Sequence, residues 1–147
     1  MVFGEIAEKA SAISHPKSGI LTVEVTHMKH LFFLGALGYP MLELAWRKRT
    51  HYSMSVAGGM SMLLIGRIRK LPLSFPARTL LCGLGITGVE CMCGRIWNRR
   101  YQVWDYRRMP LNYRGQLCLP YALVWCGLGA AMMLLLDAFE RQKQPGG

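Results

Sequence analysis

Apolar residues gather in four segments that alternate with short clusters of basic residues. The segments cover about residues 28–46, 52–68, 77–97 and 117–137. None of them shows the apolar and polar alternation that would turn one face of a helix toward water. The last segment has twenty residues without a charge, which is enough to cross the hydrocarbon core of a bilayer. The pattern therefore predicts an all-α integral membrane four-helix bundle, with a soluble helical bundle as the alternative.

The N-terminal region has a different pattern. Apolar residues there recur at helical spacing and predict a short amphipathic helix lying on the membrane interface or on the rest of the protein: Val2, Phe3, Ile6, Ala10 and Ile13. We expect Pro16 and Gly19 to end this helix. Because Glu5 and Glu8 stand where a signal peptide would be basic, no cleaved signal is expected. The predicted organisation is an amphipathic extension over 1–26, a four-span membrane domain over 27–141 and a short polar tail over 142–147.

Composition and charge narrow the choice of partners. The chain has 147 residues, of which 52% are hydrophobic and 18% charged, and its net charge is +10. Such a charge suits nucleic acid or anionic lipid headgroups. Since the basic clusters flank the apolar segments, we expect membrane lipid as a partner and no nucleic acid. With four spans, nine Lys and Arg residues fall on each side of the membrane, so the positive-inside rule predicts no orientation.

Several small residues repeat at four-residue spacing and predict close approach of helix backbones, in a tight bundle or a homo-oligomer. The rows are Ser55 and Gly59; Gly83, Thr87 and Cys91; and Gly127 and Ala131. Pro40 is expected to kink the first span. The five cysteines are odd in number and lie in or beside apolar runs, so a disulfide framework is not expected. The Cys91-x-Cys93 pair lacks further ligands, and we expect no metal and no other cofactor.

Two carboxylates within the apolar segments are the strongest candidates for chemistry. The first and third segments share a motif in which Leu-Gly is followed by four residues and then Glu: LGYPMLE and LGITGVE. With four spans these two helices run in the same direction, so we expect Glu43 and Glu90 at similar depth on the same side of the membrane. A carboxylate inside a span is costly unless it is paired, protonated or hydrated. Glu43 has Arg47 four residues later, a favourable ion pair on a helix. Glu90 has Gly94 there, so it needs a partner from another helix or from the following loop. It is either part of a structural ion pair or a relay for protons or cations.

The polar loop after the third segment interleaves rings with arginines. Trp97, Tyr101, Trp104, Tyr106 and Tyr113 could stack single-stranded nucleic acid in water, but between two spans they are typical of an interfacial segment at headgroup depth. Asp105 is the only acid among six arginines. It either forms a local salt bridge of small value or anchors the loop so that the loop closes one mouth of the bundle.

These motifs carry a resemblance to a known family. The segments YPMLELAWRKRTHYSM, GGMSMLLIG, ITGVE and WDYRRMPLNYRGQLCLP, with Asn98 and Trp125, resemble the bacterial membrane family named Putative ABC-transporter type IV over about residues 30–140. Pro40 and the N-terminal region depart from the family pattern. The family marks fall on Glu43, Thr50, His51, Ser53, Gly58, Gly59, Asn98, Trp104, Asp105, Tyr106, Pro110, Asn112, Gly115, Leu119 and Pro120.

The resemblance implies a permease that works with an ATPase, and because the chain has no phosphate-binding loop, ATP would be hydrolysed by another protein. We therefore expect a multi-pass transport component of the bacterial plasma membrane, acting as a homo-oligomer or with an ATPase subunit. Its ion or substrate pathway would contain Glu43, His51 and Glu90. Its lid and structural motif would contain Arg47, Asn98, Trp104, Asp105, Tyr106, Pro110, Asn112 and Gly115.

Two other functions fit the same pattern. The equal basic counts would suit a small dual-topology channel or proton-coupled exporter, and a structural or regulatory membrane protein without transport is a further alternative. Paired carboxylates with His51 could act on lipid headgroups. Since no nucleophile with its base and no metal signature is present, we do not expect an enzyme.

Overall fold

The structure, a computed structural model, describes residues 16–143 and the side chains from residue 24 onward. The amphipathic helix predicted for residues 2–13 lies outside the described part. The chain divides into two units, Met1–His30 and Leu31–Gly147. The second unit contains all of the residues predicted to form the site.

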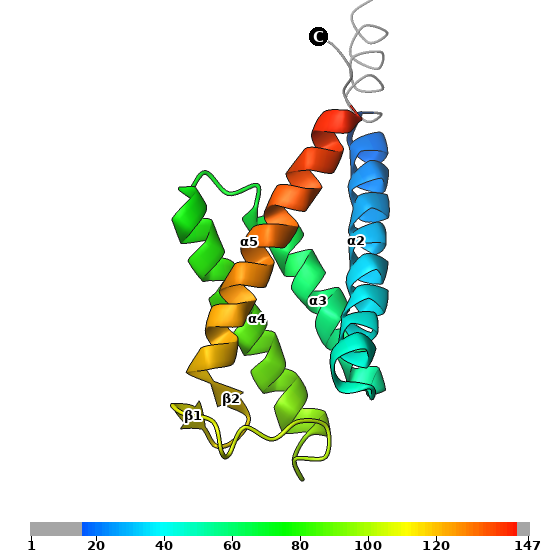
Figure 1. The fold of residues 1–147 in the computed structure, drawn as a ribbon. Helices are drawn as coiled ribbons and strands as arrows, with labels where there is room; N and C mark the ends of the chain where they lie inside the picture. Colours follow the sequence, from blue (N-terminus) through cyan, green and yellow to red (C-terminus); the bar gives the residue numbers. More distant parts are fainter. Residues whose placement is uncertain (1–15, 144–147) are drawn as a thin grey trace, which may run out of the picture. The chain divides into compact units, whose positions relative to one another are not determined.

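Four helices and one small hairpin make up the described chain (Figure 1). The helices are α2 (Pro16–Arg47), α3 (Tyr52–Ile68), α4 (Phe75–Trp97) and α5 (Leu119–Gln142), and the strands β1 (Asn112–Tyr113) and β2 (Leu117–Cys118) pair antiparallel between α4 and α5. Each of the four predicted apolar segments is helical, except that Leu117 and Cys118 at the start of the fourth form β2, and α3 has the predicted bounds. The helical class is therefore confirmed, and the hairpin is an addition that the apolar pattern did not predict.

The start of α2 corrects one expectation. Pro16 and Gly19 were expected to end a helix, but the structure describes α2 from Pro16 onward, and the helix continues through Gly19. A glycine inside a helix costs only about 1 kcal/mol relative to alanine, so Gly19 does not by itself end the helix. Residues 16–26, assigned to the extension by the sequence, thus belong to the same helix as the first apolar segment, and Pro40 lies inside that helix.

Two helices of the described chain, α4 and α5, with 23 and 24 residues, are long and apolar enough to cross a membrane. By contrast, α3 has only 17 residues, short of the roughly 20 that a span needs, and α2 contains Lys29, Glu43 and Arg47. Two such helices are weak evidence for a membrane, so a four-span arrangement stays a prediction.

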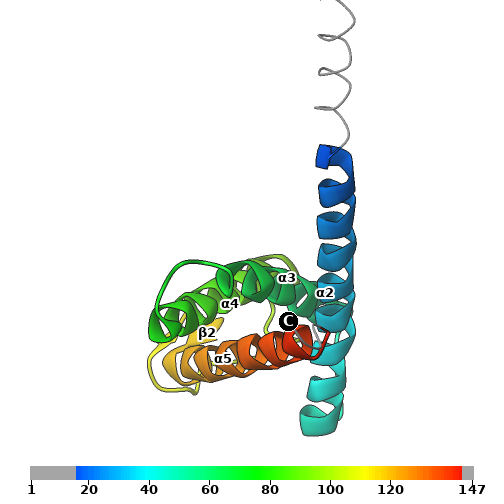
Figure 2. The same cartoon turned by 90° about the horizontal axis from the view of Figure 1, so that it is seen from above.

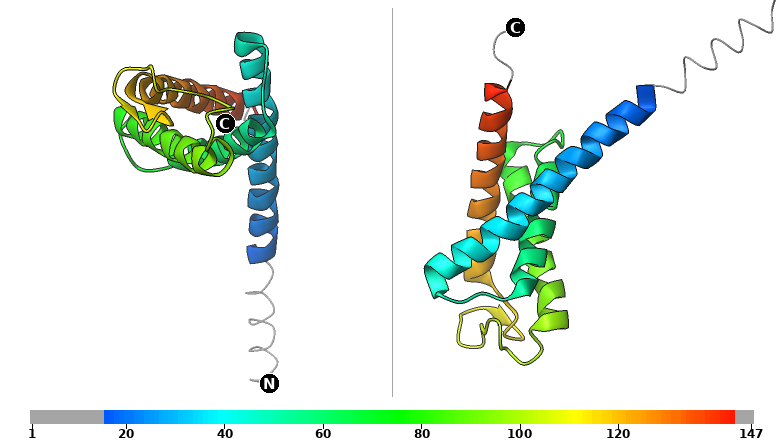
Figure 3. Two further views of the ribbon diagram at one scale, coloured as in Figure 1. Left: turned by 90° about the horizontal axis from the view of Figure 1, so that it is seen from below. Right: turned by 90° about the vertical axis from the view of Figure 1, so that its right-hand side faces the viewer.

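Close backbone contacts join the helices of the second unit. The part of α2 after residue 30 crosses α3, as Figures 1 and 3 show, and a Cβ atom placed on Gly35 would overlap the carbonyl oxygen of Gly58. Helices α4 and α5 lie side by side in Figures 1 and 2. A Cβ atom placed on Gly83 of α4 would overlap the Cys126 sulfur of α5. Small residues on α2, α3 and α4 therefore permit the close packing that the sequence predicted.

On α5 the predicted row of Gly127 and Ala131 does not pack within the bundle, so its use in contacts between copies stays a prediction. Gly127 has open space around its Cα and Ala131 is exposed, whereas Gly129 packs against Cys82 of α4. The buried residues of α5 are Trp125, Gly129, Met133 and Leu136. They recur every three or four positions and form one helix face, and Gly127 lies off that face because two residues correspond to about 200° of helix rotation.

An ion-pair cluster joins the far ends of α3 and α5. Arg69 follows α3 and is buried, and its Nη1 donates to Asp137 Oδ1 at 2.7 Å and to Glu140 Oε2 at 3.0 Å. Arg69 belongs to one of the basic clusters that flank the apolar segments, where the sequence predicted contact with lipid. In the structure its charge is matched by two acids of α5, and Arg78 Nη1 donates to its carbonyl oxygen at 2.5 Å.

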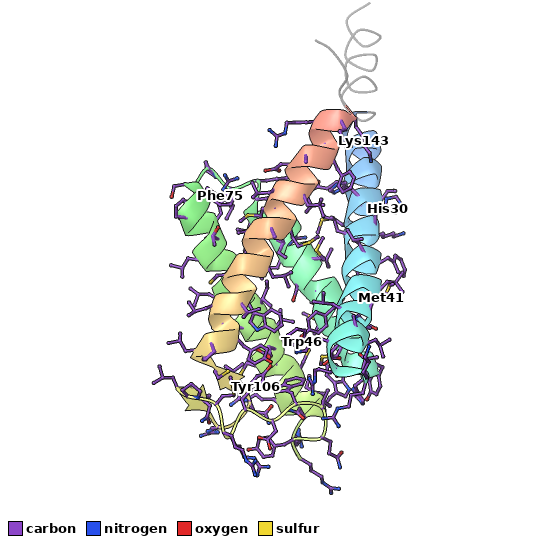
Figure 4. All side chains as sticks on the ribbon, in the orientation of Figure 1. His30, Met41, Trp46, Phe75, Tyr106 and Lys143 are labelled. Atoms are coloured by element: carbon purple, nitrogen blue, oxygen red, sulfur yellow. The ribbon has the colours of Figure 1, made fainter. Side chains whose placement is uncertain are left out.

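Large apolar side chains cover much of the outer surface. On α2 they include Leu37, Met41 and Trp46, which are 66%, 68% and 83% exposed, and Figure 4 labels Met41 and Trp46. On α5 they include Leu123 and Leu134. Extended apolar surfaces of this kind are typical of contact with lipid or with another protein.

Candidate functional site

A cavity of about 220 Å³ lies within the second unit, near the end that carries the α4–α5 loop. Its lining comes from α2, α3, α4, the loop and α5. Most of the lining is apolar, and the charged side chains among the lining residues are Glu43, Arg47 and Glu90. Both glutamates therefore line one cavity, and their location on the same side of a membrane stays a prediction.

Glu90 is buried on α4 and has two partners, both neutral. The Tyr106 hydroxyl donates to Oε1 at 2.8 Å, and the Trp125 indole N–H donates to Oε2 at 2.9 Å. The sequence predicted a partner from another helix or from the loop, and the structure supplies one from each. No ion pair among the described residues involves Glu90, so the predicted alternative of a structural ion pair does not hold there.

Tyr106 connects the loop to this carboxylate, and Figure 4 labels it at the loop end of the bundle. Burial raises the pKa of the Tyr106 phenol above its ordinary value, and the neighbouring Glu90 charge raises that pKa further. The phenol therefore keeps its proton and acts as a donor. Its ring stacks on Tyr121 with 4.7 Å between centroids, which holds the hydroxyl near the carboxylate.

Glu43 is matched by a cation, as its spacing predicted. Arg47 Nη1 donates to Oε1 at 2.9 Å and Thr50 Oγ1 donates to Oε2 at 2.8 Å. The second amino group of Arg47 donates to the carbonyl oxygen of Val103 at 2.8 Å. Arg47 thus links the end of α2 to the loop as well as neutralising Glu43.

Aromatic rings form much of the cavity wall around Glu90. Tyr39, Trp104, Tyr106 and Trp125 all line the cavity, and the Tyr39 and Trp125 rings lie 5.8 Å apart between centroids. Sequence reasoning assigned no role to Tyr39 and cited Trp125 only within the family resemblance. Tyr39 lies four residues before Glu43 on α2, so its place one turn away on the same helix face was a usable signal.

Asn98 is the residue that fixes the loop. It ends α4 and is fully buried. Its Nδ2 donates to the carbonyl oxygen of Trp104 at 2.6 Å, while its Oδ1 accepts from the backbone N–H groups of Val103 and Trp104 at 2.9 and 3.2 Å. Gln116 completes the set, since its Nε2 donates to the Asn98 carbonyl oxygen at 2.9 Å. One side chain therefore holds the loop on both sides of Trp104.

Trp104 is the part of the loop that enters the bundle. It is buried with Met54, Cys93, Tyr106 and Cys118 in one apolar cluster, and its indole N–H donates to the carbonyl oxygen of Gln116 at 2.9 Å. The loop thus closes one end of the cavity with Trp104 and Tyr106, the two buried rings of the Trp-Asp-Tyr stretch.

Asp105, between these rings, lies at the surface. Both of its carboxylate oxygens accept hydrogen bonds from Arg107, at 2.9 Å from Nε to Oδ1 and 2.7 Å from Nη2 to Oδ2. These bonds lower the pKa of Asp105 to about 2. The structure has the local salt bridge that the sequence considered first, and the anchoring contacts come from Asn98 instead, because a buried amide can both donate to and accept from the loop backbone.

Substitution of Asp105 by Asn is therefore expected to leave the thermal unfolding midpoint in detergent close to that of the wild type. The lowered pKa means that any contribution of the pair is present above about pH 4 and is lost as the pH falls toward 2. Unfolding followed at pH 7 and pH 5 should thus show the same small difference at both. A large loss at neutral pH would instead make Asp105 an anchor of the loop.

The other predicted residues have structural contacts. His51 caps the start of α3, where its Nδ1 accepts from the backbone N–H of Ser53 at 3.2 Å, and it is not among the residues that line the cavity. Asn112 Oδ1 accepts from the Gly115 N–H at 3.1 Å. Gly115 has a φ of 63° in the hairpin turn, where glycine is favoured. Pro110 lies exposed in the loop.

Comparison with known proteins assigns the chain to a family. The family model described as Putative ABC-transporter type IV matches residues 50–143. No curated protein and no solved structure matches the chain. The matched range contains α3, α4, the hairpin and α5, with Glu90, Asn98 and the Trp-Asp-Tyr stretch, and it begins after Glu43 and Arg47. Since the match covers more than half of the chain, this protein belongs to the Putative ABC-transporter type IV family.

Proposed function

We propose that this chain is a permease-like transport component of the bacterial plasma membrane and that its cavity is part of the substrate pathway. The observation that carries the proposal is the Glu90 carboxylate, which is buried in a mostly apolar cavity and contacts only neutral donors. A buried charge without a counter-ion is costly and marks a functional site in a membrane protein. The family to which the chain belongs, named for transporters, supports the same reading.

The cavity is best suited to a cation. Arg47 neutralises Glu43, so the charged side chains of the lining leave the Glu90 carboxylate unmatched. Tyr39, Trp104, Tyr106 and Trp125 present aromatic groups beside it, and aromatic faces attract cations. A small organic cation would find a counter-charge, an aromatic wall and an apolar surface in one place. A proton could occupy the carboxylate when the organic cation is absent.

Membrane insertion and assembly complete the proposal. The exposed apolar side chains of α2, α4 and α5 would contact lipid or neighbouring copies. Four helices enclose little volume, so the transport unit would be a homo-oligomer or would include a separate ATPase subunit. The proposal assigns no catalytic residue to this chain.

Substitution of Glu90 by Gln is expected to weaken binding of tetraethylammonium by at least about tenfold, because the cation loses its only unmatched counter-charge. The amide keeps the size of the side chain. Binding to the purified chain in detergent can be followed by isothermal titration calorimetry, which requires no ATPase partner. Uptake of the same cation into liposomes then tests transport.

Glu24→Gln is the matched control, because it removes an exposed carboxylate that does not line the cavity. It should bind the cation like the wild type. If neither the wild type nor the Glu24→Gln variant binds tetraethylammonium, the cavity is not a cation site. The same conclusion follows if Glu24→Gln and Glu90→Gln weaken binding equally. A wild-type chain that neither binds nor moves any of a panel of cations would favour the structural or regulatory role instead.

A further inference from the structure

A second hollow of about 240 Å³ lies between the last turns of α4 and the hairpin turn, and it shares no lining residue with the first cavity. It is lined by Arg95 and Arg99 from the α4 end, Arg114 from the turn, and Tyr101, Tyr113 and Gln116. We propose that this hollow, the arginine pocket, binds the phosphate group of an anionic phospholipid. The proposal requires a membrane but does not depend on the cation site.

The charge of the arginine pocket is uncompensated. Three arginines line it and no acid does. Among the described residues, no ion pair involves Arg95, Arg99 or Arg114, and the single acid of the loop, Asp105, is bound to Arg107. Guanidinium groups bind phosphate oxygens with paired hydrogen bonds, so a phosphate would supply the missing charge, while Arg99 Nε donates to the Arg95 carbonyl oxygen at 2.8 Å.

The pocket is built on rigid supports. Gln116, at its edge, is held by hydrogen bonds to Asn98, and a Cβ atom on Gly94 would overlap the Gln116 side chain. Tyr101 and Arg114 have φ values of 55° and 51°, which are uncommon for residues with side chains. The Tyr101 hydroxyl donates to the Arg114 carbonyl oxygen at 3.0 Å and links these two positions. Conformations of this kind cluster at functional sites.

The position of the pocket favours a lipid. It lies at the C-terminal end of α4, a helix long and apolar enough to cross a membrane, and so at the depth where headgroups would be. Met92 and Ile96, next to Arg95 on α4, are 55% and 57% exposed and could contact acyl chains. Basic residues at such a position attract anionic lipids.

Nucleic acid is a poorer fit, because the rings of the pocket are already covered. The Arg107 guanidinium lies 4.4 Å from the Tyr101 ring centroid, and that of Arg114 lies 5.5 Å from the Tyr113 centroid. A base would have to displace these cations before it could stack. A phosphate headgroup needs only the guanidinium groups.

The test measures the binding of phosphatidylglycerol and of phosphatidylcholine to the full chain in detergent by native mass spectrometry. The wild type should prefer phosphatidylglycerol. The triple substitution Arg95→Gln, Arg99→Gln and Arg114→Gln should weaken phosphatidylglycerol binding by at least about tenfold and abolish the preference. The control triple Arg49→Gln, Arg100→Gln and Arg108→Gln removes the same charge from exposed residues outside the pocket and should keep most of the preference.

Several outcomes would overturn the proposal. Equal losses in both triple variants would mean that lipid responds to overall charge and not to this pocket. Full displacement of the lipid by millimolar inorganic phosphate would indicate a site for free phosphate, and tighter binding of a single-stranded oligonucleotide than of lipid would indicate a nucleic-acid site. Circular dichroism should show equal helix content in all variants. Tetraethylammonium binding should persist in the pocket triple, which separates this proposal from that for Glu90.

Discussion

Alanine at Gly35 is expected to destabilise the protein by about 3 kcal/mol or to prevent its folding altogether, because α2 and α3 touch through their backbones at this point. The new methyl group would overlap the carbonyl oxygen of Gly58 and contact Met62 Cγ at 2.6 Å. A backbone carbonyl in a helix cannot move aside as a side chain can. The two helices would have to separate, and the cavity between them would lose its shape.

Gly38→Ala is the matched control, since it makes the same change one turn later on α2, where a Cβ atom would meet nothing within 4 Å. It should be neutral or slightly stabilising, because alanine favours the helix over glycine. Thermal unfolding in detergent, followed by tryptophan fluorescence, compares the two. Gly58→Ala, the reciprocal change on α3, should behave like Gly35→Ala. Equal midpoints for Gly35→Ala and Gly38→Ala would contradict the contact.

Alanine at Asn98 is expected to cost at least about 3 kcal/mol, because it leaves the N–H groups of Val103 and Trp104 and the carbonyl oxygen of Trp104 without their partner. A buried polar group that loses its hydrogen bond costs about 1–3 kcal/mol. The loop should then open before the helices unfold. Hydrogen exchange at residues 99–116 should accelerate more than exchange in α4 and α5.

Asn112→Ala provides the comparison within the same loop. Asn112 also bonds to the backbone, with Nδ2 donating to the Met109 carbonyl oxygen at 2.9 Å, but it is exposed, so water can replace those bonds. Its loss should cost about 1 kcal/mol or less. If the two alanine variants unfold at the same temperature, burial of Asn98 is not what holds the loop.

Sequence spacing predicted the partner of Glu43 but not the partners of Glu90. The Glu43 and Arg47 pair followed from their separation by four residues, because that distance brings side chains together on any helix. For Glu90 the same rule predicted only the lack of a neighbour on its own helix. Its partners Tyr106 and Trp125 lie 16 and 35 residues away along the chain, and no local rule connects positions so distant.

In the loop, charge was a poor guide to the residue that holds the backbone in place. Asp105 was considered as an anchor of the loop because it is the only acid among six arginines, yet its ion pair is with Arg107, two residues away at the surface. Asn98 carries no charge, and its position directly after the last residue of α4 gives no local sign of a special role. Its role depends on complete burial and on four hydrogen bonds. The sequence could identify the residue through the family resemblance but could not assign it this role.

The positions and lengths of the apolar segments were enough to predict a helix at each of the four segments, and the spacing of small residues predicted close packing, because helix formation and side-chain direction are local properties of the chain. Which small residues contact another helix depends on the tertiary structure: Gly129 packs against Cys82 of α4, whereas a Cβ atom on Gly127 would meet nothing within 4 Å. The same holds for the cavity, where one carboxylate is neutralised by its own helix and the other depends on a loop and on α5. Pairwise contacts between distant segments depend on how the helices rotate and cross, and only the folded chain determines that geometry.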